Sequence, residues 1–407
     1  MNAFPVIDGE LQVGGLSLSQ LAERAGRTPF YVYDSAQISR RIAELRAALP
    51  GAIGIHYAVK ANPYAPLLRH MAACVDGFDI ASAGELTLAL AAGMDPSRIS
   101  FAGPGKREDE LAQAVASGVL LNAESRREIE ALAAIGTRCG KPARIALRIN
   151  PAFELKGSGM RMGGGPRPFG IDEEEVPALL AELPRFGNSI RFEGFHIFAG
   201  SQNLSGEVIA ATQRASFDLA LRLAASAPSP VRTLNLGGGF GIPYTTSDAP
   251  LDMAPIAAAL RDIAAEAAQR LPETAIHLEL GRYLVGEAGV YVTRVVDEKI
   301  SRGQRYLVTD GGMNHHLAAS GNLGQVIRRN YPVAVVSPGR RTESAPDTTP
   351  TTVVGPLCTP LDMLADRVSL PKVTPGDFFV IFQSGAYGAS ASPQGFLSHP
   401  PVAEILV

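Results

Sequence analysis

The sequence predicts an α/β protein, a (β/α)8 barrel of the TIM type followed by a C-terminal all-β domain. Three observations support this prediction. Short β-rich runs alternate with helical segments rich in Ala, Leu, Glu and Arg from about residue 28 to 285, there are eight such runs, and the helical segments stop after residue 285. Eight β/α units in roughly 250 residues is the usual size of such a barrel.

The barrel strands are expected wherever a short apolar run gives way to turn-forming or polar residues. Between them lie helical stretches such as AGELTLALAAG and APIAAALRDIAAEAAQRL. A doubly wound open sheet is the alternative arrangement for the same pattern. The predicted strands are residues 53–60, 77–82, 98–103, 118–123, 143–150, 190–198, 231–237 and 275–280.

The rest of the chain reads as β-structure. After residue 285, six runs have strand character without helices between them, and FPVIDGELQVGG and TPFYVYD near the start are similar. We therefore predict a barrel over 28–285 and a β-domain formed by 1–27 and 286–407. Residues 339–350, GRRTESAPDTTP, are expected to form an exposed polar loop.

Composition excludes several classes of function. The 407 residues are 46% hydrophobic and 19% charged, with a formal net charge of −3, which does not favour binding to nucleic acid or to an anionic membrane. The seven histidines form no H-x-x-H cluster with carboxylates at metal-ligand spacing, so no metal site is predicted.

Cysteine usage and hydropathy indicate the compartment. Cys74, Cys139 and Cys358 are far apart and odd in number, which favours a reducing compartment over a disulfide framework. No basic-then-apolar leader is apparent at the start, and no apolar run approaches the roughly 18 residues of a membrane span. We expect a cytoplasmic protein.

Barrel active sites form at the carboxyl ends of the strands. Unusual residues gather at those predicted ends, and the chemistry of the site is expected there. They are Lys60, Asp79, Ser82, Arg148, His196, Phe198, Gly237, Gly238, Gly239, Glu279 and Arg282.

Lys60 ends the run IHYAVKANPY, just before an Asn-Pro turn. A strand-end lysine commonly extends its ammonium into solvent. The alternative is a lysine that works as a nucleophile inside a site. Arg148, in the apolar run ALRINP, needs an anionic partner if it is buried.

Two further motifs fit an anionic, ring-containing ligand. In NLGGGFG (235–241), three consecutive glycines let backbone N–H groups converge on a phosphate, and the loop after the seventh strand of a barrel commonly binds one; a flexible or tight turn is the alternative. In ELGR, Glu279 and Arg282 form either a structural ion pair or a carboxylate for a protonated ring nitrogen with an arginine for a phosphate. A lysine, a phosphate nest and a ring-nitrogen carboxylate together describe a pyridoxal 5'-phosphate site.

Several motifs in order carry a resemblance to a known family. HYAVKAN, GFDIASAGEL, GSQ, LNLGGGFG, ELGR, GPLC and SGAYG resemble the barrel-fold (fold type III) pyridoxal phosphate decarboxylases of the diaminopimelate and ornithine decarboxylase family, from about residue 28 to the end. The resemblance implies an alanine racemase-like architecture, in which the β-domain contributes to the active site and to a dimer interface. It also implies decarboxylation of an amino acid.

The resemblance assigns roles to individual residues. Lys60 carries the cofactor, Glu279 pairs with the pyridine nitrogen, and Cys358 reaches into the neighbouring subunit's site, where it or Lys60 reprotonates Cα. This implies a homodimer with shared sites. His196 and Phe198 match the histidine motif beside the ring, and Asp79 and Arg148 match polar residues below it. The residues expected around the phosphate are Ser201, Gly238, Gly239, Arg282 and Tyr387.

Departures from the family bear on the substrate. The chain reads HIFAGSQ where diaminopimelate decarboxylases read H-x-H-I-G-S-Q, so Phe198 replaces the stacking histidine. Phenylalanine can cover a ring face but cannot titrate. After Cys358 the family has an acid for the substrate's distal ammonium, whereas this chain has Thr359-Pro360, with Asp362 further on.

The same departures resemble a branch associated with exosortase and exopolysaccharide gene clusters, through DGGMNHHLAAS, HIFAGSQN and GPLCTPLD. That branch implies a carrier-protein-tethered amino acid, glutamyl or lysyl-like, and an opening beside His315 and Arg328–Arg329. Alternatives are a free small-molecule amino acid, an amino-acid racemase, a single-domain cofactor carrier and a catalytically inactive regulator. Glu279 argues against a racemase, which pairs the ring nitrogen with arginine.

Overall fold

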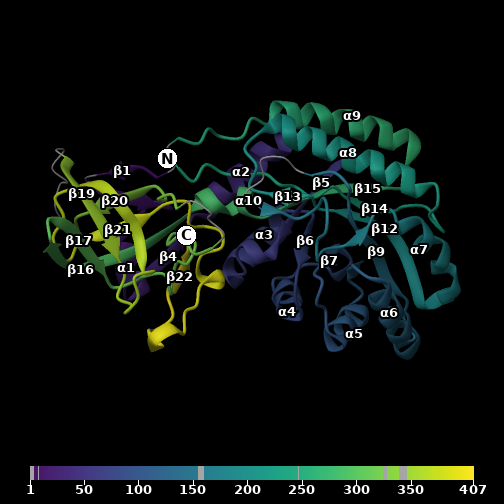
Figure 1. The fold of residues 1–407 in the computed structure, drawn as a ribbon, viewed down its shortest axis with the longest axis horizontal. Coiled ribbons are helices and arrows are strands. Elements are labelled where there is room, and N and C mark those ends of the chain that lie inside the picture. The colour runs from purple at the N-terminus through teal and green to yellow at the C-terminus, as the bar shows by residue number, and fades with distance from the viewer. Residues whose placement is uncertain (1–3, 8, 155–159, 246, 324–327, 339–345) are drawn as a thin grey trace. The chain divides into compact units, whose positions relative to one another are not determined.

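The computed structural model describes residues 4–7, 9–154, 160–245, 247–323, 328–338 and 346–407. The chain divides into two compact units (Figure 1). A β-rich unit contains residues 1–40, 243–249 and 284–407, and a barrel unit contains residues 41–242 and 250–283. The expected domain boundary at residue 28 falls inside the β-rich unit.

Eight parallel strands form the barrel in the order β9-β12-β14-β15-β5-β6-β7-β8, and pairing of β8 with β9 closes it. The closure confirms the predicted (β/α)8 barrel and excludes the open doubly wound sheet. Each predicted strand is present: β5 (Ile53–Ala58), β6 (Gly77–Ile80), β7 (Ile99–Phe101), β8 (Leu120–Ala123), β9 (Ala143–Asn150), β12 (Ile190–Ile197), β14 (Thr233–Asn235) and β15 (Ala275–Leu280).

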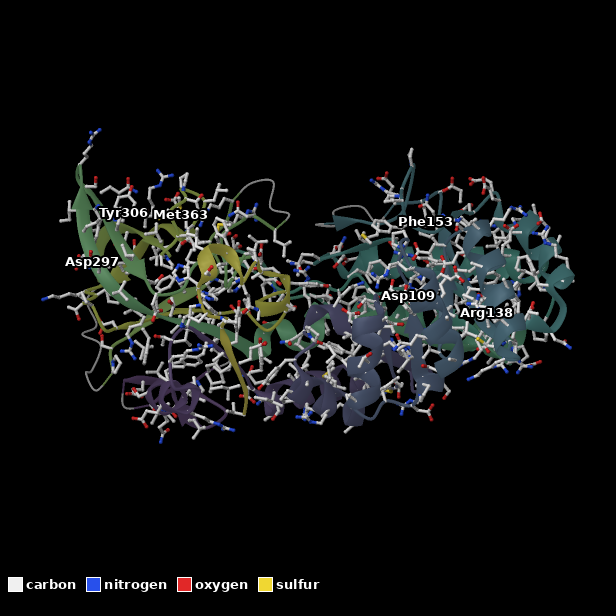
Figure 2. The ribbon with its side chains drawn as sticks, turned by 90° about the horizontal axis from the view of Figure 1, so that it is seen from below. Asp109, Arg138, Phe153, Asp297, Tyr306 and Met363 are labelled. Carbon is white, nitrogen blue, oxygen red and sulfur yellow. The ribbon has the colours of Figure 1, made fainter. Side chains whose placement is uncertain are left out.

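Helices connect these strands and begin at serine caps where the sequence supplies them. Ser82 and Ser125 accept hydrogen bonds from the backbone N–H three residues on, at α4 and α6. Figure 2 shows exposed side chains on this helical layer, among them Asp109 of α5 and Arg138 of α6. The helices are α2 (Ser35–Ala48), α3 (Ala65–Cys74), α4 (Ala83–Ala91), α5 (Glu108–Ser117), α6 (Arg126–Cys139), α7 (Val176–Glu182), α8 (Gly206–Ala224), α9 (Ala254–Arg270) and α10 (Arg282–Val285).

Shorter elements complete the barrel unit. Two-residue strands lie beside β9 and at the strand ends: β10 (Met160–Arg161), β11 (Ile171–Asp172) and β13 (Gly200–Ser201). No helix among the described residues is long and apolar enough to cross a membrane.

The β-rich unit is built on a mixed eight-stranded sheet, with the path β18-β21-β16-β17-β19-β20 and with β4 beside β16 and β22. Asp297, Tyr306 and Met363 mark three of its strands in Figure 2. The strands are β4 (Phe30–Tyr33), β16 (Gly289–Ser301), β17 (Gln304–Thr309), β18 (Val333–Val336), β19 (Pro346–Val354), β20 (Met363–Pro371), β21 (Phe378–Ile381) and β22 (Ala403–Leu406).

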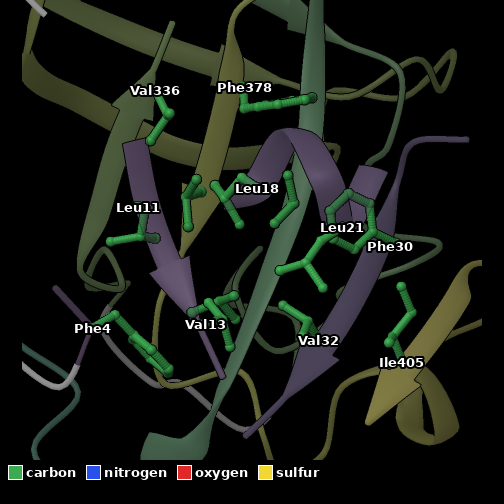
Figure 3. Close-up of a cluster of buried hydrophobic side chains, with 13 residues drawn as sticks. Phe4, Leu11, Val13, Leu18, Leu21, Phe30, Val32, Val336, Phe378 and Ile405 are labelled. Carbon is green, nitrogen blue, oxygen red and sulfur yellow. The ribbon is translucent and has the colours of Figure 1, made fainter. Parts of the chain in front are cut away.

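The N-terminal segment packs on this sheet. It forms β1 (Val6–Ile7), β2 (Glu10–Val13), β3 (Leu16–Ser17) and α1 (Leu18–Ala25). Figure 3 shows its apolar side chains meeting those of the C-terminal strands in one buried cluster. Burial of this apolar surface is the main force that holds the first residues to strands formed by the last ones.

The structure corrects one sequence-based expectation. Residues 346–350 do not form the end of a polar loop but the first part of β19, which pairs with β20. The run that follows is rich in threonine, which favours strands. Residues 339–345 lie outside the described residues.

Candidate active site

Lys60 and Glu279 meet at the carboxyl edge of the barrel. Lys60 lies in a single 3₁₀ turn, η1 (Val59–Ala61), directly after β5, while Glu279 lies near the end of the adjacent strand β15. Lys60 Nζ is 3.1 Å from Glu279 Oε1. The Lys60 side chain is 43% exposed and that of Glu279 only 5%. The lysine can therefore be reached from outside, whereas the carboxylate is fixed beneath it.

His196 occupies the other oxygen of the same carboxylate. It lies near the end of β12, is buried, and places Nε2 3.0 Å from Glu279 Oε2. One carboxylate thus holds a lysine ammonium on one oxygen and an imidazole N–H on the other.

These contacts determine the charge of Glu279. Burial acts to raise the pKa of Glu279, because a charged carboxylate loses its hydration. The positive charge of Lys60 and the hydrogen bond from His196 outweigh burial, and the pKa lies well below the ordinary value for glutamate. Glu279 is therefore ionised at neutral pH.

Phe198 lies beside the lysine. Lys60 Nζ is 5.5 Å from the centre of the Phe198 ring, and the Phe198 and His196 rings are nearly parallel, 10° apart, with centres 6.5 Å from one another. Phe198 is half-buried, so one part of the ring remains available to a planar ligand.

A second cluster of polar side chains lies on the barrel strands β5, β6 and β15. Asp79, on β6, accepts a hydrogen bond of 2.5 Å from the Ser100 hydroxyl, and its other oxygen lies 3.5 Å from His56 Nδ1. The His56 ring stacks on that of His277, with centres 3.9 Å apart. Burial lowers the pKa of His277 well below its ordinary value, and His56 and His196 lower it further, so His277 is neutral.

His56, Asp79 and His277 place ligand-type atoms within 4.8 Å of one another. Their geometry nevertheless does not suit a metal ion. The two rings are within 17° of parallel, and the in-plane lone pairs of stacked imidazoles run side by side instead of converging on one ion. We assign no metal site to these residues.

Arg148 has the anionic partner that its burial requires. Arg148 Nη1 lies 2.7 Å from Glu124 Oε1, and its guanidinium lies 5.1 Å from the centre of the Phe169 ring. Glu124 also accepts backbone hydrogen bonds from Gly103 and Gly170. This ion pair fixes the loops that follow three adjacent strands, β7, β8 and β9.

The glycine run after β14 requires glycine. Gly237 has a φ of +70°, and a Cβ there would lie 2.8 Å from the Ile197 carbonyl oxygen. A Cβ on Gly238 would lie 2.2 Å from the Glu279 carbonyl oxygen. The backbone therefore lies directly against β12 and β15, where side chains would exclude it.

Ser201 and Arg282 both follow the carboxyl ends of barrel strands, β12 and β15. Ser201 belongs to β13, which pairs with β10, and Arg282 begins α10 directly after β15. Cys358 and Tyr387 belong to the β-rich unit instead. The Cys358 residue is exposed, and Tyr387 has a φ of +54°, uncommon for a bulky residue.

Asp362 joins two loops of the β-rich unit. Its carboxylate is buried and accepts hydrogen bonds from the backbone N–H of Met313, at 2.6 Å, and of Leu357, at 2.8 Å. A Cβ on Gly312 or Gly355 would lie 2.2 or 2.4 Å from that carboxylate. Asp362 therefore holds the GPLC segment to the DGGMN segment.

The described residues do not decide whether the expected opening lies beside His315. His315 is buried, with Nε2 2.9 Å from the Pro400 carbonyl oxygen, and Arg328 donates to the Met363 carbonyl. Residues 324–327, between them, lie outside the described residues, and the opening stays a prediction.

Three residues of these networks were not singled out from the sequence: His56, Glu124 and His277. His277 lies two positions before Glu279, and the period of two in a strand indicates that both face the same side. Glu124 had a weaker signal, as the first residue after a buried strand.

Comparison with known proteins identifies relatives over nearly the whole chain. The family model described as "Pyridoxal-dependent decarboxylase, pyridoxal binding domain" matches residues 35–286. An L-glutamyl-[BtrI acyl-carrier protein] decarboxylase of Niallia circulans is 39% identical over 93% of this chain and 88% of its own length. A diaminopimelate decarboxylase of Aquifex aeolicus is 34% identical over 98% and 91%. The crystal structure of a Helicobacter pylori diaminopimelate decarboxylase complexed with L-lysine matches with a TM-score of 0.84 and 29% identity, covering 96% of this chain and 94% of that one.

Proposed function

Because this chain belongs to the family of pyridoxal-dependent decarboxylases, we propose that its substrate is a glutamyl-like amino acid attached to a carrier protein. The activity itself is pyridoxal 5'-phosphate-dependent decarboxylation of an amino acid or an amino acid derivative. Loss of CO2 from Cα needs a free α-carboxylate, so a tethered glutamyl group has to be attached through its side-chain carboxyl.

The observation that carries this proposal is that the Asp362 carboxylate is already hydrogen-bonded to backbone amides. A free diamino acid has a distal ammonium, which needs an acid in the site. Thr359 and Pro360 follow Cys358 here, and Asp362, the next carboxylate in the chain, is buried and bonded to the amides of Met313 and Leu357. A substrate whose far end is an uncharged thioester needs no such acid.

The relative from Niallia circulans, which is named for an L-glutamyl carrier-protein substrate, also supports the tethered form. We further propose that the chain belongs to the branch associated with exosortase and exopolysaccharide clusters, through the motifs HIFAGSQN and GPLCTPLD. Its three cysteines are free, which supports a reducing compartment such as the cytoplasm.

The residues at the barrel edge fit the cofactor. Lys60 is exposed enough to react with an aldehyde, Glu279 is ionised beneath it, and the backbone of Gly237 and Gly238 lies against the strands at this edge without side chains. When bound, pyridoxal phosphate supplies an electron sink for the electrons left at Cα as CO2 departs. Glu279 would hold the ring-nitrogen proton that makes this sink effective, and Phe198 would cover a ring face.

The remaining site residues complete the proposal. Ser201, Gly238, Gly239, Arg282 and Tyr387 would hold the phosphate. Asp79 and Arg148 would support the ring from inside the barrel. Lys60 would hold the cofactor through its aldehyde carbon.

After CO2 leaves, Cα needs a proton. We propose that Cys358 of the partner subunit in a homodimer supplies it, since Cys358 is exposed on its own subunit. Lys60 is the alternative donor.

Measurement of CO2 release by the cofactor-loaded protein tests the substrate. We would offer free diaminopimelate, lysine, ornithine, arginine and glutamate, and then a glutamyl group on a carrier protein, with a lysyl carrier, which has no free α-carboxylate, as the negative control. Release from the glutamyl carrier alone is expected. Lys60→Ala should abolish it, and Lys141→Ala, at an exposed lysine, should not. Turnover of a free diamino acid at a comparable kcat/KM would contradict the proposal.

A further inference from the structure

We propose that His196 is a positioning residue for Glu279, holding Oε2 of the carboxylate through Nε2–H so that Oε1 faces the cation that the site binds. This inference rests on the role proposed above for Glu279 toward the pyridine nitrogen. It assigns to the first histidine of HIFAGSQ a function that is separate from ring stacking, which falls to Phe198.

The contact is well defined. His196 is 1% exposed, and its Nε2 lies 3.0 Å from Glu279 Oε2. A carboxylate accepts hydrogen bonds only, so Nε2 has to carry the proton. The histidine and the glutamate are both buried, so the bond is shielded from bulk solvent.

The other ring nitrogen makes no competing contact. Nδ1 of His196 is buried and has no hydrogen-bond partner among the described residues. The contact between Nε2 and Glu279 therefore sets the orientation of the ring.

An N–H donor suits this role. Its hydrogen bond to Oε2 fixes the orientation of the carboxylate and leaves Oε1 for the cation.

Lys60 cannot serve as the orienting group throughout the reaction. It holds Oε1 in this structure, but its nitrogen is needed at the aldehyde carbon once the cofactor is present. His196 is then the remaining side chain with a hydrogen bond to the carboxylate among those described. The titratable groups around Glu279 are Lys60, His196, Glu85, His277 and His56.

Removal of the histidine should change the titration of the site. Burial acts to raise the pKa of Glu279, and the His196 hydrogen bond is one of the contacts that lower it. Without the donor, Glu279 takes up a proton at higher pH, and the ring nitrogen loses its counter-ion there. The acid limb of the site's pH profile should therefore move to higher pH.

The test compares three substitutions in the cofactor-loaded protein. His196→Leu removes the donor, His196→Asn keeps an amide too short to reach Glu279, and His196→Gln keeps one that can reach. Phe195→Leu, on the opposite face of the same strand, controls for lost packing, because Phe195 is also fully buried.

The main readout is the absorbance of the bound cofactor across pH, which needs no substrate. The Leu and Asn variants should move the acid limb up by about one pH unit or more, and Gln should return it to within about half a unit. The dissociation constant of the cofactor should rise in the same order. With the substrate proposed above, kcat should fall about tenfold or more for Leu and Asn while KM changes little.

An acid limb that is the same in wild type, Asn and Leu would overturn the inference, as would a Gln variant that shifts as far as Asn. If His196→Leu does not fold, the Asn and Gln pair decides the question alone. Because the spectral measurement uses no substrate, failure of the tethered-substrate proposal leaves this test intact.

Discussion

Replacement of Asp362 by alanine separates a structural carboxylate from a substrate-binding one. In the structure, the carboxylate is 2% exposed and accepts hydrogen bonds from the Met313 N–H at 2.6 Å and the Leu357 N–H at 2.8 Å. Alanine leaves both N–H groups buried without an acceptor. We therefore expect Asp362→Ala to lower stability without changing which substrate is preferred.

The expected magnitude follows from those two bonds. Each buried donor left without a partner costs about 1–3 kcal/mol, so the variant should lose roughly 2–6 kcal/mol, a large share of the roughly 5–15 kcal/mol that typical domains have. Asp362→Asn keeps one oxygen and places an amide against the second N–H, and it should lose about half as much.

Urea unfolding followed by far-UV circular dichroism measures the change, because the chain contains no tryptophan for fluorescence. Asp297→Ala, at an exposed position of β16, is the matched control and should stay within about 0.5 kcal/mol of wild type. The reasoning is refuted if Asp362→Ala unfolds with wild type yet selectively loses one substrate. That outcome would make Asp362 the missing distal acid.

Three further changes probe the barrel edge and the substrate end. Arg148→Leu removes the ion-pair partner of the buried Glu124 carboxylate, which keeps its hydrogen bonds from Gly103 and Gly170. It should lower the free energy of unfolding by about 3 kcal/mol, measured by thermal and urea unfolding, with Arg148→Lys less severe; an unchanged midpoint would contradict the ion-pair assignment. Gly238→Ala places a Cβ 2.2 Å from the Glu279 carbonyl oxygen, and cofactor titration should show at least about tenfold weaker binding; wild-type affinity would contradict the role of this backbone in cofactor binding. Thr359→Glu supplies an acid at the position after the cysteine, and CO2 release from free diamino acids should rise above background, which an unchanged substrate profile would disprove.

The barrel could be predicted because its signals are local. Strand β5 alternates Ile53, Ile55 and Tyr57, and the strand-end position of Lys60 follows from where that alternation stops. The single 3₁₀ turn at the lysine was not predicted, because Val59 continues the apolar run and a short turn has no separate sequence signal.

The β-rich unit was predicted less completely because its strands depend on partners that are distant in the sequence. Strand β20 (Met363–Pro371) contains Asp366 and Arg367, and its burial depends on β19 as a partner. Cross-strand pairing, more than the strand's own pattern, makes such a segment β.

Polar partners inside the barrel show the same limit. Glu124, directly after β8, reaches Arg148 on the neighbouring strand β9, and His56 meets His277 because barrel closure brings β5, the first strand, beside β15, the last. Sequence indicated that Arg148 needed an anion but could not say which one. Side-chain networks across strands depend on strand register, which a local sequence pattern does not determine.

The pairing of β4 with β22 has a consequence for synthesis of the protein. Tyr33 and Glu404, whose side chains share a hydrogen bond between these strands, are 371 residues apart. At a translation rate of about 5–20 residues per second, β4 leaves the ribosome roughly 20–70 s before its partner. The barrel residues are complete well before then, so we expect the barrel to fold first during translation. Until β22 is synthesised, the edge of β4 that pairs with it stays exposed, and we expect this edge to need protection by a chaperone.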